Sequence, residues 1–155
     1  MKVQEYFKKG QEVWVITGQG IKKAVYWRLE NINGRFRWVY LGEIENYKDD
    51  YGNTKSCDEF PESKVFTSRE AAVEFLRTGK TEDLKAVKTH ESLFNPGEVG
   101  YRIGRGGVES ERFESVRWRI GQFEYHTNGG GAAVYPERGR WFRTREEAVE
   151  ALLAM

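Results

Sequence analysis

The sequence predicts an α+β protein that is mostly β and is built from two copies of one small antiparallel unit, each ending in a short α-helix. Three observations support this prediction: a helix-like segment occurs twice, a longer segment upstream of it occurs twice, and apolar and polar residues alternate within both copies. Internal repetition of a segment of about 60 residues is typical of a duplicated unit. We therefore expect a first unit at residues 1–80, a linker at 81–95 and a second unit at 96–155.

The repeated helix is VFTSREAAVEFL, beginning at Val65, and WFRTREEAVEALL, beginning at Trp141. Ser68 and Thr144 stand where an N-cap is needed, because a hydroxyl there accepts a hydrogen bond from a free amide of the first turn. Glu147 completes a capping box with Thr144. The pattern predicts helices over 68–77 and 144–154, each too short to be stable in water without packing against a neighbouring surface.

The upstream repeat aligns Gly10–Trp38 with Gly97–Tyr125 without a gap, and it keeps glycines and aromatic residues in register. The first copy then carries extra residues before its helix, in or near NYKDDYGNTKSC. This run is polar and contains glycine, so it predicts an enlarged loop.

Alternation with a period of two predicts short strands in both copies. In the first copy the Asn33-Gly34 pair favours a tight hairpin turn between two of them. In the linker, EDLKAVKT is compatible with a short helix, and Leu93 and Phe94 are expected to dock on the second unit. The expected strands are EVWVITG, KAVYWRLENI and FRWVYLG in the first copy, and GYRIG, FESVRWRI, FEYHT and AAVY in the second.

This succession of a hydrophobic strand, a glycine turn, further strands and a final F-x-T-x-E-E-A-x-x-x-L helix resembles small SH3-like barrels, including Tudor and KOW types, that occur in uncharacterised bacterial and phage proteins. The resemblance covers both units and rests on pattern. It implies a binding module and does not identify the ligand.

Composition narrows the possible partners. The 25 Lys and Arg residues nearly balance the 24 Asp and Glu residues, so no overall charge favours nucleic acid or an anionic membrane. Cys57 is the single cysteine, which excludes an internal disulfide and favours a reducing cytoplasm. The sequence contains no run of about 20 apolar residues, and we expect no membrane association.

Residues suited to catalysis or metal binding are few. Cys57, His90 and His126 do not form the close pairs that a zinc site requires. Asp49 and Asp50, with Asp58 and Glu59, lack the spacing of a calcium loop. We expect no enzyme activity, no metal and no cofactor.

The glycine turn GRGGVES leads into a strand, whereas a phosphate-binding loop opens a helix. The simpler interpretation of this turn is therefore a hairpin that needs glycines. Arg105 within it keeps a small anionic ligand as an alternative.

Positions at which the two copies disagree indicate candidate binding residues. Trp27 aligns with Glu114, and Trp118 aligns with Asn31. If equivalent positions share a similar degree of burial, neither tryptophan belongs to a core. Trp and Arg are enriched at binding hot spots. The candidate binding residues are thus the two tryptophans and their arginine neighbours, with Arg105 added for an anion: Trp27, Arg28, Arg117, Trp118, Arg119 and Arg105.

The same two tryptophans are also compatible with two structural roles. They can join the two units to each other, or β-bulges can shift the strand register and return them to the core.

These features predict a non-catalytic protein-binding adaptor or inhibitor, and the resemblance suggests a phage or mobile-element origin. Two alternatives remain. Nucleic-acid binding requires one clustered basic face formed by Arg28, Arg35, Arg37, Arg117 and Arg119. Binding of a small anion or nucleotide between the units would use Arg105 and the glycine turns.

Overall fold

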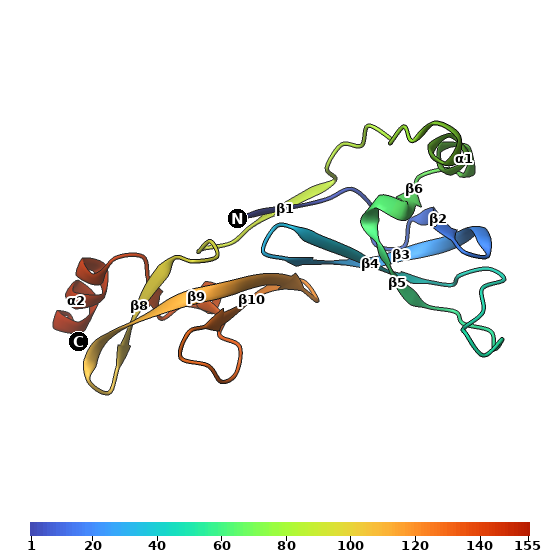
Figure 1. The fold of residues 1–155 in the computed structure, drawn as a ribbon. Coiled ribbons are helices and arrows are strands. Elements are labelled where there is room, and N and C mark those ends of the chain that lie inside the picture. The colour runs from blue at the N-terminus through green and yellow to red at the C-terminus, as the bar shows by residue number, and fades with distance from the viewer. The chain divides into compact units, whose positions relative to one another are not determined.

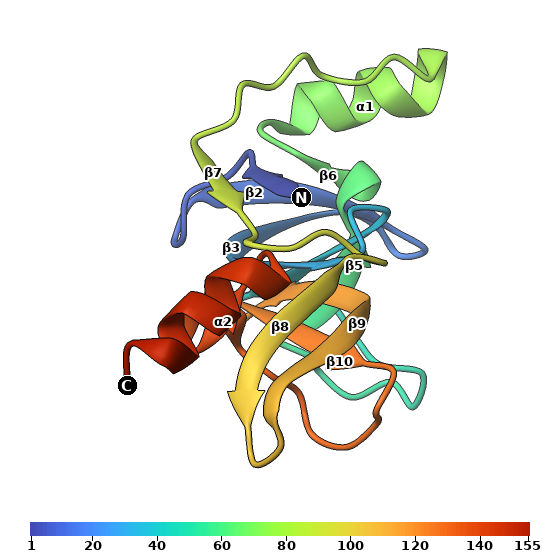
Figure 2. The same cartoon turned by 90° about the vertical axis from the view of Figure 1, so that its left-hand side faces the viewer.

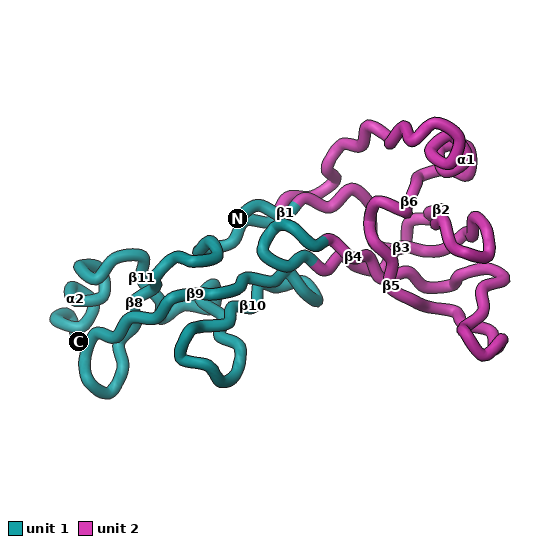
Figure 3. The backbone as a smooth tube through the Cα atoms, in the orientation of Figure 1, with its two compact units in different colours: residues 1–3, 31–36, 90–155 teal, residues 4–30, 37–89 magenta.

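The computed structural model describes residues 1–155, which divide into two compact units (Figure 3). Unit 1 comprises Met1–Val3, Asn31–Phe36 and His90–Met155. Unit 2 comprises Gln4–Glu30 and Arg37–Thr89. A short segment of the first sequence copy, residues 31–36, therefore groups with the C-terminal part of the chain.

Unit 2 contains an antiparallel sheet with one helix beside it (Figure 1). Its strands run in the order β6-β2-β3-β4-β5. The last residues of β3 and the first of β4 belong to unit 1. The elements are β2 (Glu12–Thr17), β3 (Gly20–Ile32), β4 (Phe36–Gly42), β5 (Asp58–Pro61), a 3-10 turn (Glu62–Lys64), β6 (Val65–Phe66) and α1 (Arg69–Thr78).

The alternation in the sequence sets which face of this sheet is buried. Val13 and Val15 of β2 and Val39 and Leu41 of β4 are completely buried, while the residues between them are more exposed. Helix α1 packs against β2 and β6. Its N-cap is confirmed, because the Ser68 side chain accepts a hydrogen bond from the Ala71 amide at 3.1 Å.

Unit 1 contains a second antiparallel set of strands in the order β11-β8-β9-β10. The end of β3 also pairs with β9, with Asn31 opposite Trp118. Figure 2 shows α2 lying along β8, and α2 packs against both β8 and β9. The elements are β8 (Val99–Gly104), β9 (Gly107–Arg119), β10 (Gln122–Thr127), a 3-10 turn (Pro136–Arg138), β11 (Trp141–Phe142) and α2 (Arg145–Leu153).

Aromatic side chains form the centre of unit 1. Phe94 packs on Phe113 with ring centroids 4.7 Å apart, and Phe113 packs edge-on against Tyr125 at 5.0 Å. All three residues are buried, which confirms that Phe94 docks on the second copy. The capping box of Thr144 and Glu147 at the start of α2 is also confirmed.

Two strands were not expected from the alternation pattern. They are β1 (Lys2–Glu5) and β7 (Lys88–Glu91), which pair with each other. The short helix expected over EDLKAVKT is wrong, because β7 begins within that segment. The strand expected at AAVY is also wrong, since only Val134 makes an isolated bridge, to Tyr125.

The turns and the enlarged loop agree with the prediction. Asn33 and Gly34 both have positive φ, 53° and 73°, as a tight type I′ hairpin turn requires. Between β4 and β5 the chain forms a loop with one isolated bridge, Lys48 to Thr54. The fold is thus α+β and mostly β, as predicted, with open antiparallel sheets and no closed barrel.

Neither helix has the length and apolar character that crossing a membrane requires.

Candidate functional site

Strands β3 and β4 of unit 2 carry a group of exposed or half-buried aromatic and arginine side chains, which we call the aromatic face: Trp27, Arg28, Trp38 and Tyr40. Strand alternation turns Trp38 and Tyr40 away from the buried side, where Val39 and Leu41 lie. Trp27 retains 37% and Trp38 retains 42% of its full exposure. Exposed apolar side chains that are grouped, unlike single ones, often mark an interaction site.

Three members of the aromatic face, Trp27, Arg28 and Tyr40, contact one another. The rings of Trp27 and Tyr40 lie 5.3 Å apart at an interplanar angle of 37°. The guanidinium carbon of Arg28 lies 4.3 Å from the centroid of the Tyr40 ring, a cation–π contact. Arg28 also lies 3.9 Å from the Glu30 carboxylate. Because Trp27, Arg28 and Tyr40 each have a packed neighbour, little of their side-chain freedom remains to be lost on binding.

Gly42 positions the indole of Trp27. A Cβ atom at Gly42 would lie 2.0 Å from Cε2 and Cζ2 of Trp27, so the ring rests directly on the glycine backbone. Only glycine leaves room for this contact.

The single cysteine lies beside the aromatic face. The Tyr40 hydroxyl donates a hydrogen bond to Sγ of Cys57 at 3.3 Å, and this bond raises the pKa of Tyr40. Cys57 belongs to unit 2, whereas His90 and His126 both belong to unit 1. The hydrogen-bond partner of this thiol is therefore a phenol.

Trp118, the second predicted surface tryptophan, is buried, with 9% of its full exposure. The expectation that it lies on the surface is wrong. The expectation rested on the alignment of Trp118 with the polar residue Asn31, and Asn31 is itself buried. The β9–β10 ladder also contains a β-bulge, because His126 pairs with Ser115 and Thr127 pairs with Phe113, which skips Glu114. A bulge exchanges the two faces of a strand, and Phe113, Val116 and Trp118 are therefore all buried.

Trp118 lines a hollow of about 220 Å³ in unit 1, which we call the Trp118 pocket. Phe123 meets Trp118 edge-on, with ring centroids 4.9 Å apart. His90 also stacks on the Trp118 indole, with ring centroids 3.7 Å apart and an interplanar angle of 19°. The lining residues are Trp118, Gly121, Gln122, Phe123, Tyr135, Glu137 and Arg138.

The predicted arginines are divided between the two units. Arg28 belongs to unit 2, and Arg117, Arg119 and Arg105 belong to unit 1. Arg117 is half-buried and pairs with Ile32, and Arg119 is exposed at the end of β9. Arg105 is exposed in the turn before β9, at the opposite end of that strand. A strand of this length spans about 40 Å, so Arg105 and Arg119 cannot contact one ligand group.

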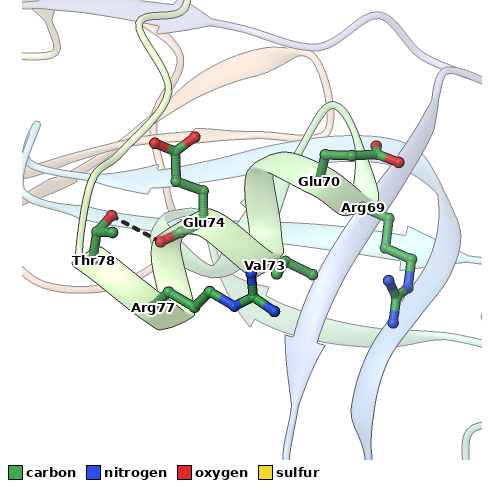
Figure 4. Close-up of a pocket in the computed structure, with 6 residues that line it drawn as sticks. All are labelled: Arg69, Glu70, Val73, Glu74, Arg77 and Thr78. Atoms are coloured by element: carbon green, nitrogen blue, oxygen red, sulfur yellow. Dashed lines mark hydrogen bonds between the residues drawn. The ribbon is translucent and has the colours of Figure 1, made fainter.

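Another hollow, of about 340 Å³, runs along α1. Figure 4 shows Arg69, Val73 and Arg77 following one side of the helix, with Glu70 and Glu74 on the other. Every lining residue comes from this one helix, so the hollow has a single wall and holds no convergent polar groups. We assign no site to it.

The acidic residues of the enlarged loop have structural partners. Asp49 accepts hydrogen bonds from the amides of Tyr51 and Asn53, each at 2.9 Å. Asp58 accepts from the Tyr47 hydroxyl at 3.1 Å and pairs with Lys55 at 3.2 Å. No three His, Cys, Asp or Glu side chains are arranged to hold a metal ion.

Several residues of these sites escaped the sequence analysis. Alternation along β4 could have placed Trp38 and Tyr40 on the outer face of the sheet, because it puts them on the side opposite the apolar residues Val39 and Leu41. No local signal indicated Tyr135 and Arg138, which lie in an irregular segment after β10.

Comparison with known proteins does not assign a family: no family model, curated protein or solved structure matches this chain.

Proposed function

We propose that this protein is a non-catalytic protein-binding adaptor or inhibitor that contacts its partner through the aromatic face. The observation that carries the proposal is the group of two part-exposed tryptophans beside an arginine stacked on a tyrosine. Trp, Tyr and Arg are the residue types that dominate binding hot spots, since they combine large apolar area with directed polar contacts.

The scaffold favours this role. The side chains of the aromatic face project from paired strands, and Trp27 is further held by Gly42. A rigid site loses less conformational entropy when a partner binds than a flexible loop does.

Protein is favoured over nucleic acid because arginines of the expected basic face already have partners. Arg37 donates to both oxygens of Glu62, at 2.7 and 3.0 Å. Arg28 lies over Tyr40 and near Glu30. Affinity for nucleic acid depends on cationic side chains that can neutralise phosphates. Arg28 and Arg37 are less able to do so, because they already contact a carboxylate.

Duplication of an SH3-like unit is part of the same proposal. The succession of elements supports it. Apart from β5, which has no counterpart strand, the first copy runs β2, β3, β4, a 3-10 turn, β6 and α1, and the second runs β8, β9, β10, a 3-10 turn, β11 and α2. The capped helix starts at Ser68 and Thr144 also correspond. Two linked binding units raise the effective concentration of the second contact, which gives duplication a physical benefit. The resemblance to phage proteins suggests a phage or mobile-element origin.

Affinity capture from a bacterial lysate, with and without nuclease, tests the proposal. We expect a partner protein that survives nuclease treatment, binds the wild type, and is lost with the Trp27→Ala, Trp38→Ala double variant. Tyr51→Ala is the matched control, since Tyr51 is an exposed aromatic residue of the same unit outside the aromatic face. With the purified partner, each tryptophan substitution should weaken binding about tenfold or more. Capture that disappears with nuclease, or that the double variant retains, would contradict the proposal.

A further inference from the structure

The Trp118 pocket has the size of a site for one ring with a small substituent. Its volume of about 220 Å³ exceeds the roughly 150 Å³ that accommodates benzene in a protein interior. It is smaller than the roughly 300 Å³ at which pockets for drug-sized ligands begin. One arene with one polar group therefore fits, and a nucleotide does not.

Three aromatic residues give the pocket its apolar character. Trp118 and Phe123 meet at 64°, so the pocket has two differently oriented ring surfaces. Tyr135 lines the pocket as a third ring. His90 stacks on the indole of Trp118, and Phe123 packs against it edge-on, so two neighbours restrict the orientation of this ring.

Arg138 supplies a cation in a defined orientation. Its guanidinium carbon lies 4.2 Å from the centroid of the Tyr135 ring, and one of its terminal nitrogens donates to Oε1 of Gln122 at 2.7 Å. No carboxylate forms an ion pair with Arg138. The guanidinium thus lines an aromatic pocket in a set orientation and forms no ion pair with Glu137, the carboxylate of the same lining.

Glu137, the other charged residue of the lining, is held by neutral donors and not by Arg138. Oε1 of Glu137 accepts hydrogen bonds from the Leu93 amide, at 2.8 Å, and from the Tyr125 hydroxyl, so this carboxylate has partners other than Arg138. Gln122 uses its side-chain oxygen for Arg138 and keeps its amide N–H groups as donors.

We propose that the Trp118 pocket binds an aromatic carboxylate. The ring packs among Trp118, Phe123 and Tyr135, while the carboxylate accepts hydrogen bonds from Arg138 and the Gln122 amide. An aromatic cation fits poorly, because Arg138 already covers a face of Tyr135 and carries the same charge. This site lies in unit 1 and does not depend on the aromatic face of unit 2.

Titration of the full chain with phenylacetate, followed by NMR, tests the proposal. The indole N–H signal of Trp118, assigned with the Trp118→Phe variant, should shift saturably together with the Gln122 amide signals. Phenylacetamide and phenyltrimethylammonium are the neutral and cationic probes, and each should bind at least about tenfold more weakly than phenylacetate.

Matched variants locate the charge that matters. Arg138→Gln should weaken phenylacetate about tenfold or more, whereas Arg143→Gln, at an exposed arginine outside the pocket, should leave binding unchanged. Trp27→Ala should also leave it unchanged, so this test and that of the aromatic face fail or succeed separately. Equal binding of the three probes, preference for the ammonium, or an unaffected Arg138→Gln variant would overturn the proposal.

Discussion

Asn31 and Trp118 stand opposite each other where the end of β3 pairs with β9, and they are also the two residues that the internal repeat aligns. Both are buried, with 1% and 9% of their full exposure. The premise that aligned positions share a similar degree of burial therefore holds for this pair. The inference that an aromatic residue aligned with a polar one must be exposed does not hold, since Asn31 is a buried amide that accepts a hydrogen bond from the Gly34 N–H at 2.8 Å.

The neighbouring turn residue, Asn33, should contribute measurably to stability. The Val116 amide donates to its side-chain oxygen at 2.8 Å, and the Asn33 amide donates to the Val116 carbonyl at 2.8 Å. Asn33→Gly keeps the positive φ but removes the side-chain acceptor, so we expect a loss of about 1–3 kcal/mol. Asn33→Asp keeps an acceptor and should cost less. Equal urea-unfolding free energies for the wild type and Asn33→Gly would refute this role.

Ile120 occupies the corresponding turn position in the second copy, with a φ of 50°. A β-branched residue is strained in this left-handed conformation by about 1–2 kcal/mol, whereas asparagine tolerates it. Ile120→Asn should therefore raise the free energy of unfolding by about 1 kcal/mol. Ile120→Val, which keeps the β-branch, should give no gain. A destabilised Ile120→Asn protein would show that the exposed isoleucine has a packing role.

Gly42→Ala should destabilise unit 2 by about 1–3 kcal/mol, because the added methyl group overlaps the Trp27 indole. Denaturant unfolding measures the cost, and a change in tryptophan fluorescence of the folded state reports the displaced ring. Gly18→Ala is the control, since nothing lies within 4 Å of a Cβ at that position. Equal losses for the two variants would mean that the contact with Trp27 is not the cause.

Alkaline pH should weaken the fold through Tyr26. Burial raises the pKa of Tyr26 above its ordinary value, and the hydrogen bond that its hydroxyl donates to Glu5 at 2.7 Å raises it further. The folded state thus favours the protonated phenol. Its contribution is complete below about pH 10, where an unfolded tyrosine ionises, and is lost as the pH rises further, at up to about 1.4 kcal/mol per pH unit.

Urea unfolding between about pH 8 and about pH 11 brackets that ionisation and measures the decline. Tyr26→Phe should decline less steeply, while Tyr51→Phe, at an exposed tyrosine, should follow the wild type. Parallel curves for Tyr26→Phe and the wild type would assign the decline to other groups.

Much of the fold was predictable because its signals are local. Alternation located β2, β3, β4, β8 and β10, and the hydroxyl caps located both helices. The strand β7 was missed because Lys88–Glu91 is polar and is stabilised by pairing with β1, far away in sequence.

The candidate sites were harder to predict. Trp118 was expected on the surface because it aligns with the polar residue Asn31, and no sequence pattern marks Asn31 as a buried amide. Trp38 and Phe36 align with Tyr125 and Phe123, yet the first pair is exposed and the second is buried. Repeated sequence therefore did not guarantee repeated burial. Arg138 reaches Tyr135 and Gln122 through tertiary structure alone.

The position of Cys57 beside Tyr40 makes its thiol a useful labelling site. The chain contains one thiol, half-buried and adjacent to the ring on which Arg28 stacks. A fluorophore or spin label that reacts with thiols can attach at this one residue only, and it would lie beside the proposed contact surface. Such a probe would register the arrival of a partner as a change in its own mobility, before the partner has been identified.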